Sequence, residues 1–260
     1  AYDNPTPDRA EFFYPQSAWL PGGGGPPVSP TSPETGVDYQ EFELQAESLL
    51  IGDLVSGFIE VPFRLINPEV SDNTGGISDL RAGMRVALLK DCRRYLTLQL
   101  RTYIPTGDGG RGLGTDHVSL EPALLCMRRF RNGLILQGEV RDWIPIGGSD
   151  DELGDYAGNV LRYGVGISRR CLHHGRVSAY PVFETVGWSV LGGDVLDLNA
   201  PKERAAANTT IVNLKLGTRF NLAPRYRGCG TKSLYVGYGT SVTGNRWYRD
   251  VVRAEYRIAY

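Results

Sequence analysis

The stretch "YLTLQLRTYI" (Tyr95–Ile104) alternates between two kinds of side chain with a period of two. One set is Leu96, Leu98, Leu100, Thr102 and Ile104, and the other is Tyr95, Thr97, Gln99, Arg101 and Tyr103. Successive side chains of a strand point to opposite faces, so this pattern predicts a β-strand with one apolar and one polar face. A soluble sheet would turn its polar face to water, whereas a transmembrane barrel would turn its apolar face to lipid.

The same alternation recurs along the chain. The final stretch "VVRAEYRIAY" (251–260) separates Val252, Ala254, Tyr256, Ile258 and Tyr260 from Arg253, Glu255 and Arg257. Further strands are predicted at 9–14, 38–51, 57–66, 80–89, 117–126, 134–143, 160–168, 177–190, 209–220 and 233–242. These make about twelve strands, most of them close to the roughly 9–11 residues that cross a bilayer in a tilted strand.

The composition favours an all-β protein. The 260 residues include 33 Gly and 14 Tyr but only 2 Met, and no helical periodicity is sustained. No stretch approaches the roughly 18 consecutive apolar residues of a spanning helix. The net charge of -1 provides no overall field for nucleic acid, so no nucleic-acid partner is expected. No signal peptide is visible, and Ala1 suits the residue that follows a cleavage site, so a mature chain is expected.

The connections between the predicted strands alternate in length. Long ones such as "PTGDGGRGLGTD" (105–116) follow short ones such as "KDCRR" (90–94). Short turns at one end and long loops at the other are typical of outer-membrane barrels. We therefore predict an all-β fold, a closed antiparallel up-and-down transmembrane β-barrel of about 12 strands with short periplasmic turns and long extracellular loops. Residues 1–8 would be a periplasmic segment, 9–260 a single barrel, and 15–37 a first extracellular loop rich in Pro and Gly.

Three prolines interrupt predicted strands. Pro62, Pro122 and Pro181 cannot donate a ladder hydrogen bond, and a closed barrel has no free edge to accommodate them. We expect either β-bulges at these residues or pairing that leaves each ring nitrogen at a non-bonded position.

Several segments resemble a known family. They are "RAEFF" (9–13), "IEVPFRLINPEVSDNTGGISDL" (59–80), "YIPTGDGGRGLGTDHVSLEPALL" (103–125), "EVRDWIPIGG" (139–148), "AGNVLRYGVGIS" (157–168) and "FETVGWSVLGG" (183–193). From about Arg9 onward the chain is similar to the outer-membrane β-barrels grouped with the phenol-degradation meta-pathway. The resemblance implies an outer-membrane barrel with a transporter-like role. The link to aromatic hydrocarbons belongs to only some members and is not transferred to this chain.

Charged residues occupy the predicted inward face. The candidates for the lumen and its selectivity are Arg81, Arg85, Arg101, Glu121, Glu139, Arg141, Arg162, Glu184, Lys215, Arg219, Arg253, Glu255 and Arg257, with Glu41, Glu43 and Glu60 on the same face. An Arg or Lys facing lipid near the midplane would cost roughly 2–4 kcal/mol. Two interpretations follow. The charges line a polar pore for small polar or amphiphilic solutes, with a slight cationic excess that favours anions, or they form a salt-bridged plug in a non-conducting structural barrel.

The two ends differ in charge. The short turns carry Lys90, Arg93, Arg94, Arg128, Arg129, Arg131, Arg169, Arg170, Arg176, Arg225 and Arg227, whereas the long loops are acidic. Expected partners are outer-membrane lipids and lipopolysaccharide, the barrel-assembly machinery through Tyr260, and other envelope proteins at this basic periplasmic rim, although a merely solvated rim is the alternative. The expected location is the outer membrane of a Gram-negative-type bacterium. "SDDELGD" (149–155) lacks calcium-loop spacing, and no metal or other cofactor is predicted.

The four cysteines fall near short turns. Disulfides Cys92–Cys126 and Cys171–Cys229 are predicted for an oxidising periplasm, although four cysteines allow three pairings. The alternatives are free thiols, or a metal held by Cys171 with His173 and His174.

One arrangement suggests catalysis. His117 and Ser119 lie two residues apart, as a serine hydrolase dyad within a barrel would require. Their predicted inward orientation and their flanking residues differ from an outer-membrane phospholipase, so a polar pair at the rim is expected, and no enzyme activity is predicted.

Overall fold

The computed structural model describes residues 37–68, 72–108, 111, 113–115, 117–146, 150–151, 154–155, 158–192, 194–195, 204–205, 210–223, 230–243 and 249–260. The strands are β1 (Val37–Ile51), β2 (Val55–Pro68), β3 (Thr74–Ile77), β4 (Leu80–Lys90), β5 (Arg94–Ile104), β6 (Val118–Arg129), β7 (Leu134–Ile146), β8 (Asp150–Asp151), β9 (Gly154–Asp155), β10 (Val160–Arg169), β11 (Leu172–His174), β12 (Val177–Val190), β13 (Asp194–Val195), β14 (Arg204–Ala205), β15 (Thr210–Leu222), β16 (Thr231–Ser241) and β17 (Asp250–Ala259). No helix among these residues is long and apolar enough to cross a membrane.

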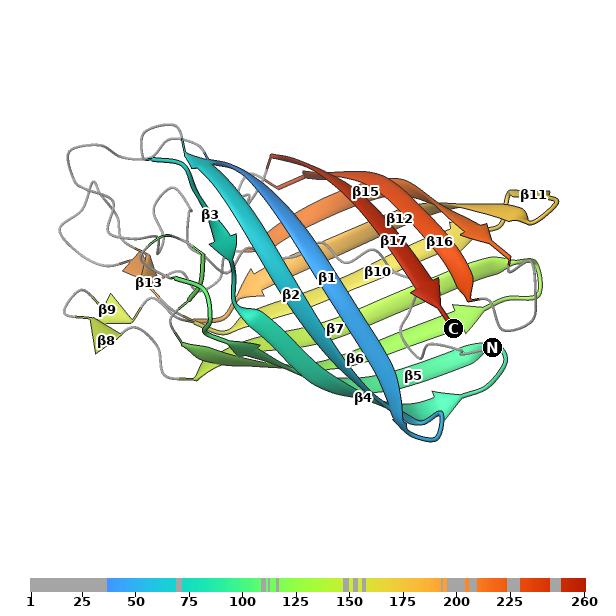
Figure 1. Ribbon diagram of the computed structural model, residues 1–260, viewed down its shortest axis with the longest axis horizontal. Coiled ribbons are helices and arrows are strands. Elements are labelled where there is room, and N and C mark those ends of the chain that lie inside the picture. The colour runs from blue at the N-terminus through green and yellow to red at the C-terminus, as the bar shows by residue number, and fades with distance from the viewer. Residues whose placement is uncertain are drawn as a thin grey trace.

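The principal sheet is antiparallel and follows the chain. Its order is β1-β2-β4-β5-β6-β7-β10-β12-β15-β16-β17, and the short strands β3 and β11 pair with β2 and β12 to bring the total to 13. Each long strand pairs with the next long strand, and the sheet curls into a half-barrel (Figure 1). This confirms the predicted all-β, up-and-down architecture.

The predicted long strands match the structure closely, and the segment predicted at 177–190 has the same bounds as β12. The strand predicted at 9–14 lies outside the described residues. β1 and β17 are the two edges of the sheet, and no ladder joins them within the described part of the chain. Closure of the barrel therefore stays a prediction.

The loops are segregated as predicted. Figure 1 shows the short turns after β1, β4 and β6 at one end of the sheet and the longer connections after β2, β5 and β7 at the other. The hairpin between β11 and β12 turns through Gly175, whose φ of 58° is in the left-handed region that favours glycine.

The two faces of the sheet have the predicted polarity. On β5, Leu98 and Leu100 are 47% and 48% exposed on the convex side, whereas Gln99 and Arg101 are buried on the concave side. The same alternation continues in β6 and β7. The sheet is therefore inverted relative to a soluble domain, with apolar side chains outside and charged side chains inside.

The three prolines sit where a ladder is interrupted. Pro62 lies between the pairing of β2 with β4, which ends at Glu60, and its pairing with β3, which begins at Phe63. At Pro122 the β6–β7 register passes from Leu120 directly to Ala123, and Pro181 lies just beyond the end of the β10–β12 ladder at Val182. Each ring nitrogen thus faces a gap on one side of its strand, while the ladder on the other side continues. Of the two expectations, this is pairing that leaves the ring nitrogen at a non-bonded position.

Aromatic side chains fill the concave face near the long loops. Tyr103, Trp143 and Trp188 pack there with Val160, Val186 and Ile211 in one buried cluster. On β15 and β16, the ring of Tyr235 lies over Gly217 and Gly237, where any larger side chain would overlap it. Glycines on the curved inner wall therefore make room for large rings on neighbouring strands.

The prediction of a Cys92–Cys126 disulfide is wrong. Cys92, Cys126 and Cys171 carry free thiols, and Cys229 lies outside the described residues. Cys126 pairs in register with Leu96, four residues beyond Cys92. Four residues of extended chain span roughly 13 Å, whereas the Cα atoms of a disulfide lie within about 7 Å.

Candidate functional site

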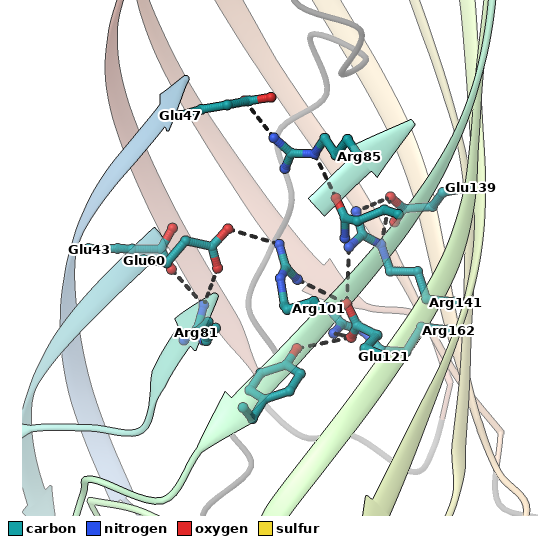
Figure 2. Close-up of polar contacts among 12 residues, drawn as sticks. Glu43, Glu47, Glu60, Arg81, Arg85, Arg101, Glu121, Glu139, Arg141 and Arg162 are labelled. Carbon is teal, nitrogen blue, oxygen red and sulfur yellow. Dashed lines mark hydrogen bonds and ion pairs between the residues drawn. The ribbon is translucent and has the colours of Figure 1, made fainter. Parts of the chain in front are cut away.

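The concave face between β1 and β10 carries a network of buried ion pairs, shown in Figure 2. Alternate positions of neighbouring strands turn charged side chains to this face, and the curvature brings them together. Ten residues form one continuous series of ion pairs: Arg64, Glu41, Arg81, Glu43, Glu60, Arg101, Glu121, Arg141, Glu139 and Arg162.

Glu121 on β6 is the centre of this network. Its Oε1 accepts hydrogen bonds from Arg101 Nη1 at 2.9 Å and from Arg141 Nη1 at 3.1 Å. Its Oε2 accepts from Arg162 Nη1 at 2.5 Å and from the Tyr103 hydroxyl at 3.0 Å. The side chains of Glu121 and Arg141 are both fully buried. One carboxylate therefore joins three guanidinium groups from three other strands.

Three further carboxylates, Glu60, Glu43 and Glu41, extend the network toward β1. Arg101 Nη2 donates to Glu60 at 3.0 Å, and Arg81 lies 3.5 Å from the same carboxylate. Arg81 also donates to Glu43 at 2.6 Å and approaches Glu41 at 3.4 Å. These contacts reach from β4 across β2 to β1, so they span strands that are not neighbours in the sheet.

Arg85 on β4 forms a separate pair deeper toward the short turns. It donates to Glu47 at 2.5 Å and to the side-chain oxygen of Gln99 at 2.8 Å. Its guanidinium group lies 4.2 Å from the centre of the Phe58 ring, within the range of a cation–π contact. Phe58 in turn packs against Gly83, where a side chain would overlap the ring.

The charges between β1 and β10 are balanced. Six arginines, Arg64, Arg81, Arg85, Arg101, Arg141 and Arg162, face six glutamates, Glu41, Glu43, Glu47, Glu60, Glu121 and Glu139. Removing ions from water costs several kcal/mol each, and close pairing with hydrogen bonds offsets that cost. This half of the concave face is consequently neutral overall, and most of its charged side chains are buried.

The other half of the concave face, between β12 and β17, carries more cationic than anionic residues. On β17, Glu255 is paired with Arg219, Arg253 and Arg257, each at 3.1 Å. The side chains of Arg253 and Arg257 are 26% and 25% exposed, in contrast to the buried arginines of the first network. Glu184 on β12 and Lys215 on β15 are both buried and lie opposite each other in register. Between β12 and β17, the predicted lumen residues are four cations and two carboxylates, so the predicted cationic excess lies here.

The predicted lumen residues thus fall into two groups. Arg81, Arg85, Arg101, Glu121, Glu139, Arg141 and Arg162 lie in the β1–β10 half, and Glu184, Lys215, Arg219, Arg253, Glu255 and Arg257 lie in the β12–β17 half. The prediction omitted Arg64 and Glu47. Arg64 lies four residues after Glu60, and Glu47 lies four residues after Glu43, so each shares a face with a residue that the prediction included. A strict count along each strand would have found them.

The two residues of the candidate dyad make separate contacts. The His117 ring nitrogen Nδ1 lies 2.7 Å from the carbonyl oxygen of Thr115, and Ser119 is fully buried. The contacts of the described residues include no hydrogen bond between His117 and Ser119. Likewise, no group of three His, Cys, Asp or Glu suited to a metal ion occurs in the part of the chain described.

Comparison of the sequence with protein-family models finds no matching family, and comparison with curated proteins finds no matching relative.

Proposed function

We propose that this protein is an outer-membrane β-barrel that passes small polar or amphiphilic solutes, with a mild preference for anions. The observation that carries the proposal is the inverted polarity of the sheet, with leucines outside and paired charges inside. The resemblance to transporter-like barrels points the same way. A lipid environment explains why exposed leucines such as Leu98 and Leu100 cover the convex face.

The solute path runs along the β15–β17 wall in this proposal. The ion pairs of the β1–β10 half are buried and neutral, whereas Arg253 and Arg257 are partly exposed and belong to a cationic group. A cationic wall lowers the energy of an anion in a narrow pore and raises that of a cation. The expected behaviour is therefore a small conductance with weak anion selectivity.

Planar-bilayer recording tests this proposal. The wild-type protein is expected to give steady ohmic steps, with a reversal potential in a salt gradient that indicates anion preference. The double variant R253Q/R257Q should lose that preference, because both cations are removed from the path. The matched control R249Q removes an arginine that is 82% exposed just before β17 and should retain the wild-type selectivity.

A second candidate is a non-conducting structural barrel. The near-complete burial of Glu121 and Arg141 favours it, because a lumen filled by ion pairs has no room for solute. Silence of the wild-type protein at high protein load, with insertion verified independently, would support this candidate and exclude the channel.

A further inference from the structure

A basic pocket opens between two short turns, at the end of the sheet opposite the long loops. It lies between the β4–β5 turn at 91–93 and the β6–β7 turn at 130–133 and has a volume of about 590 Å³. Its charged lining is Arg93, Arg94, Arg128, Arg129 and Arg131 with one carboxylate, Asp91, and Phe130 provides an aromatic wall. Five arginines and a single carboxylate therefore line the pocket.

The arginines are arranged in a way that costs stability. Arg94 and Arg128 are directly opposite each other in the β5–β6 ladder, so their side chains leave the same face of the sheet. One residue further out, the backbone N–H of Arg129 donates to the carbonyl of Arg93 at 2.7 Å, so a second pair of arginines lies opposite each other, with side chains that leave the other face of the sheet. Like charges at opposite positions of adjacent strands repel each other. A bound anion would remove this repulsion.

The one carboxylate at the pocket is already engaged. Asp91 accepts hydrogen bonds from the backbone N–H groups of Arg93 and Arg94 and from Nε of Arg94 at 2.7 Å. The N–H of Arg93 is the main cause that holds the pKa of Asp91 below its usual value, and the Arg94 side chain adds to it. Asp91 therefore stays ionised and neutralises only Arg94.

The remaining arginines have no carboxylate partner at this pocket. Arg128 lies over the Phe130 ring at 5.0 Å from its centre. The ion pairs among the described residues include none for Arg93, Arg128, Arg129 or Arg131. Four of the five arginines that line the pocket are thus without an ion-pair partner among the described residues.

The lining identifies the ligand by its chemistry. The planar fork of a guanidinium group matches two oxygens of a phosphate, and several forks around one site fit a group with more than one negative charge. The volume falls in the range of about 300–1,000 Å³ typical of small-molecule sites, which leaves room for an organic body against Phe130. We propose that the basic pocket binds the phosphate or diphosphate group of an organic anion, supplied either by a soluble phosphoester or by a lipid headgroup.

Binding to the full-length protein in zwitterionic micelles tests the proposal with two probes. Inorganic pyrophosphate, titrated by calorimetry, represents a soluble phosphate. Phosphatidic acid, compared with phosphatidylcholine by native mass spectrometry, represents a lipid phosphate. The pocket variant is R93A/R129A. The control is R169A/R170A, which removes the same charge from exposed arginines at the β10–β11 turn of the same rim.

The pocket variant should bind the effective probe at least about tenfold more weakly, because charge-assisted hydrogen bonds are lost, whereas the control should change affinity less than about twofold. Pyrophosphate binding with this pattern assigns a soluble ligand, and selective retention of phosphatidic acid alone assigns a lipid. Equal losses of affinity in both double variants would show that the general positive charge of the rim explains the binding. That result would overturn the proposal. Binding of neither probe by the wild-type protein would also overturn it, and neither result bears on conductance through the lumen.

Discussion

Arg101 and Glu60 form an ion pair of 3.0 Å although strand β4 lies between their strands. Strands two apart in a flat sheet are roughly 9–10 Å from each other, so these side chains meet because the sheet curls and long side chains lean across its concave face. The pair Arg162–Glu121, which reaches across β7, repeats the relationship. Such contacts tie alternate strands together and oppose flattening of the sheet.

The first prediction concerns the centre of the network. Substitution of Glu121 by Ala should lower the free energy of unfolding by about 3–5 kcal/mol, because Arg101, Arg141 and Arg162 would then be buried without their shared carboxylate. Urea unfolding of the protein in phosphatidylcholine vesicles measures the change. Asp53→Ala is the control, since Asp53 is 69% exposed in its pair with Lys90 and should contribute little. Equal effects of the two substitutions would show that burial of the network carries no special weight.

The second prediction tests whether lipid or water covers the convex face. Leu100 lies in the middle of β5 with its side chain 48% exposed. Leu100→Arg should weaken folding into vesicles by roughly 2–4 kcal/mol, whereas Leu89→Arg near the end of β4 should cost only about 0–1 kcal/mol. Folding titrations into vesicles give both values. A neutral or stabilising effect at Leu100 would mean that water covers this face, and the membrane proposal would fail.

The third prediction concerns the reactivity of the thiols of Cys92 and Cys126. Without any reductant, Cys92 and Cys126 should both react with a maleimide, because the register places them too far apart for a disulfide. Intact mass and peptide mapping after denaturation locate the labels. Protection of this pair that disappears on reduction would contradict the β5–β6 register. Cys92→Ser should leave labelling of Cys126 unchanged.

The fourth prediction concerns the glycines under Tyr235. Gly237→Ala should cost about 1–3 kcal/mol of unfolding free energy, because the new methyl group overlaps the Tyr235 ring. In the background Tyr235→Ala, the same substitution should instead stabilise the strand by roughly 0.5 kcal/mol, since glycine weakens a strand relative to alanine. A double-mutant cycle in urea reports the sign. An unchanged cost in both backgrounds would mean that the ring does not rest on Gly237.

The order of hydrophobic and charged residues was sufficient to predict most of the strands. Period-two alternation is a local property, so β5 and β12 were located within a residue or two of their ends. The short strands were missed because two to four residues carry too little pattern; β11, for example, exists only because Leu172–His174 fold back onto β12. The same locality explains the wrong disulfide, because turn lengths alone did not reveal that Cys126 pairs with Leu96.

The order of residue types along the chain is enough to assign which side chains share a face, since a strand of either solvent preference must alternate. Which of the inward charges meet depends on how the sheet folds. Curvature of the sheet joined Glu121 to three arginines in a buried, neutral half of the concave face and left Arg253 and Arg257 partly exposed in a cationic half. The two properties differ because alternation is set between adjacent residues, whereas an ion pair depends on distances across strands that only the curled sheet defines.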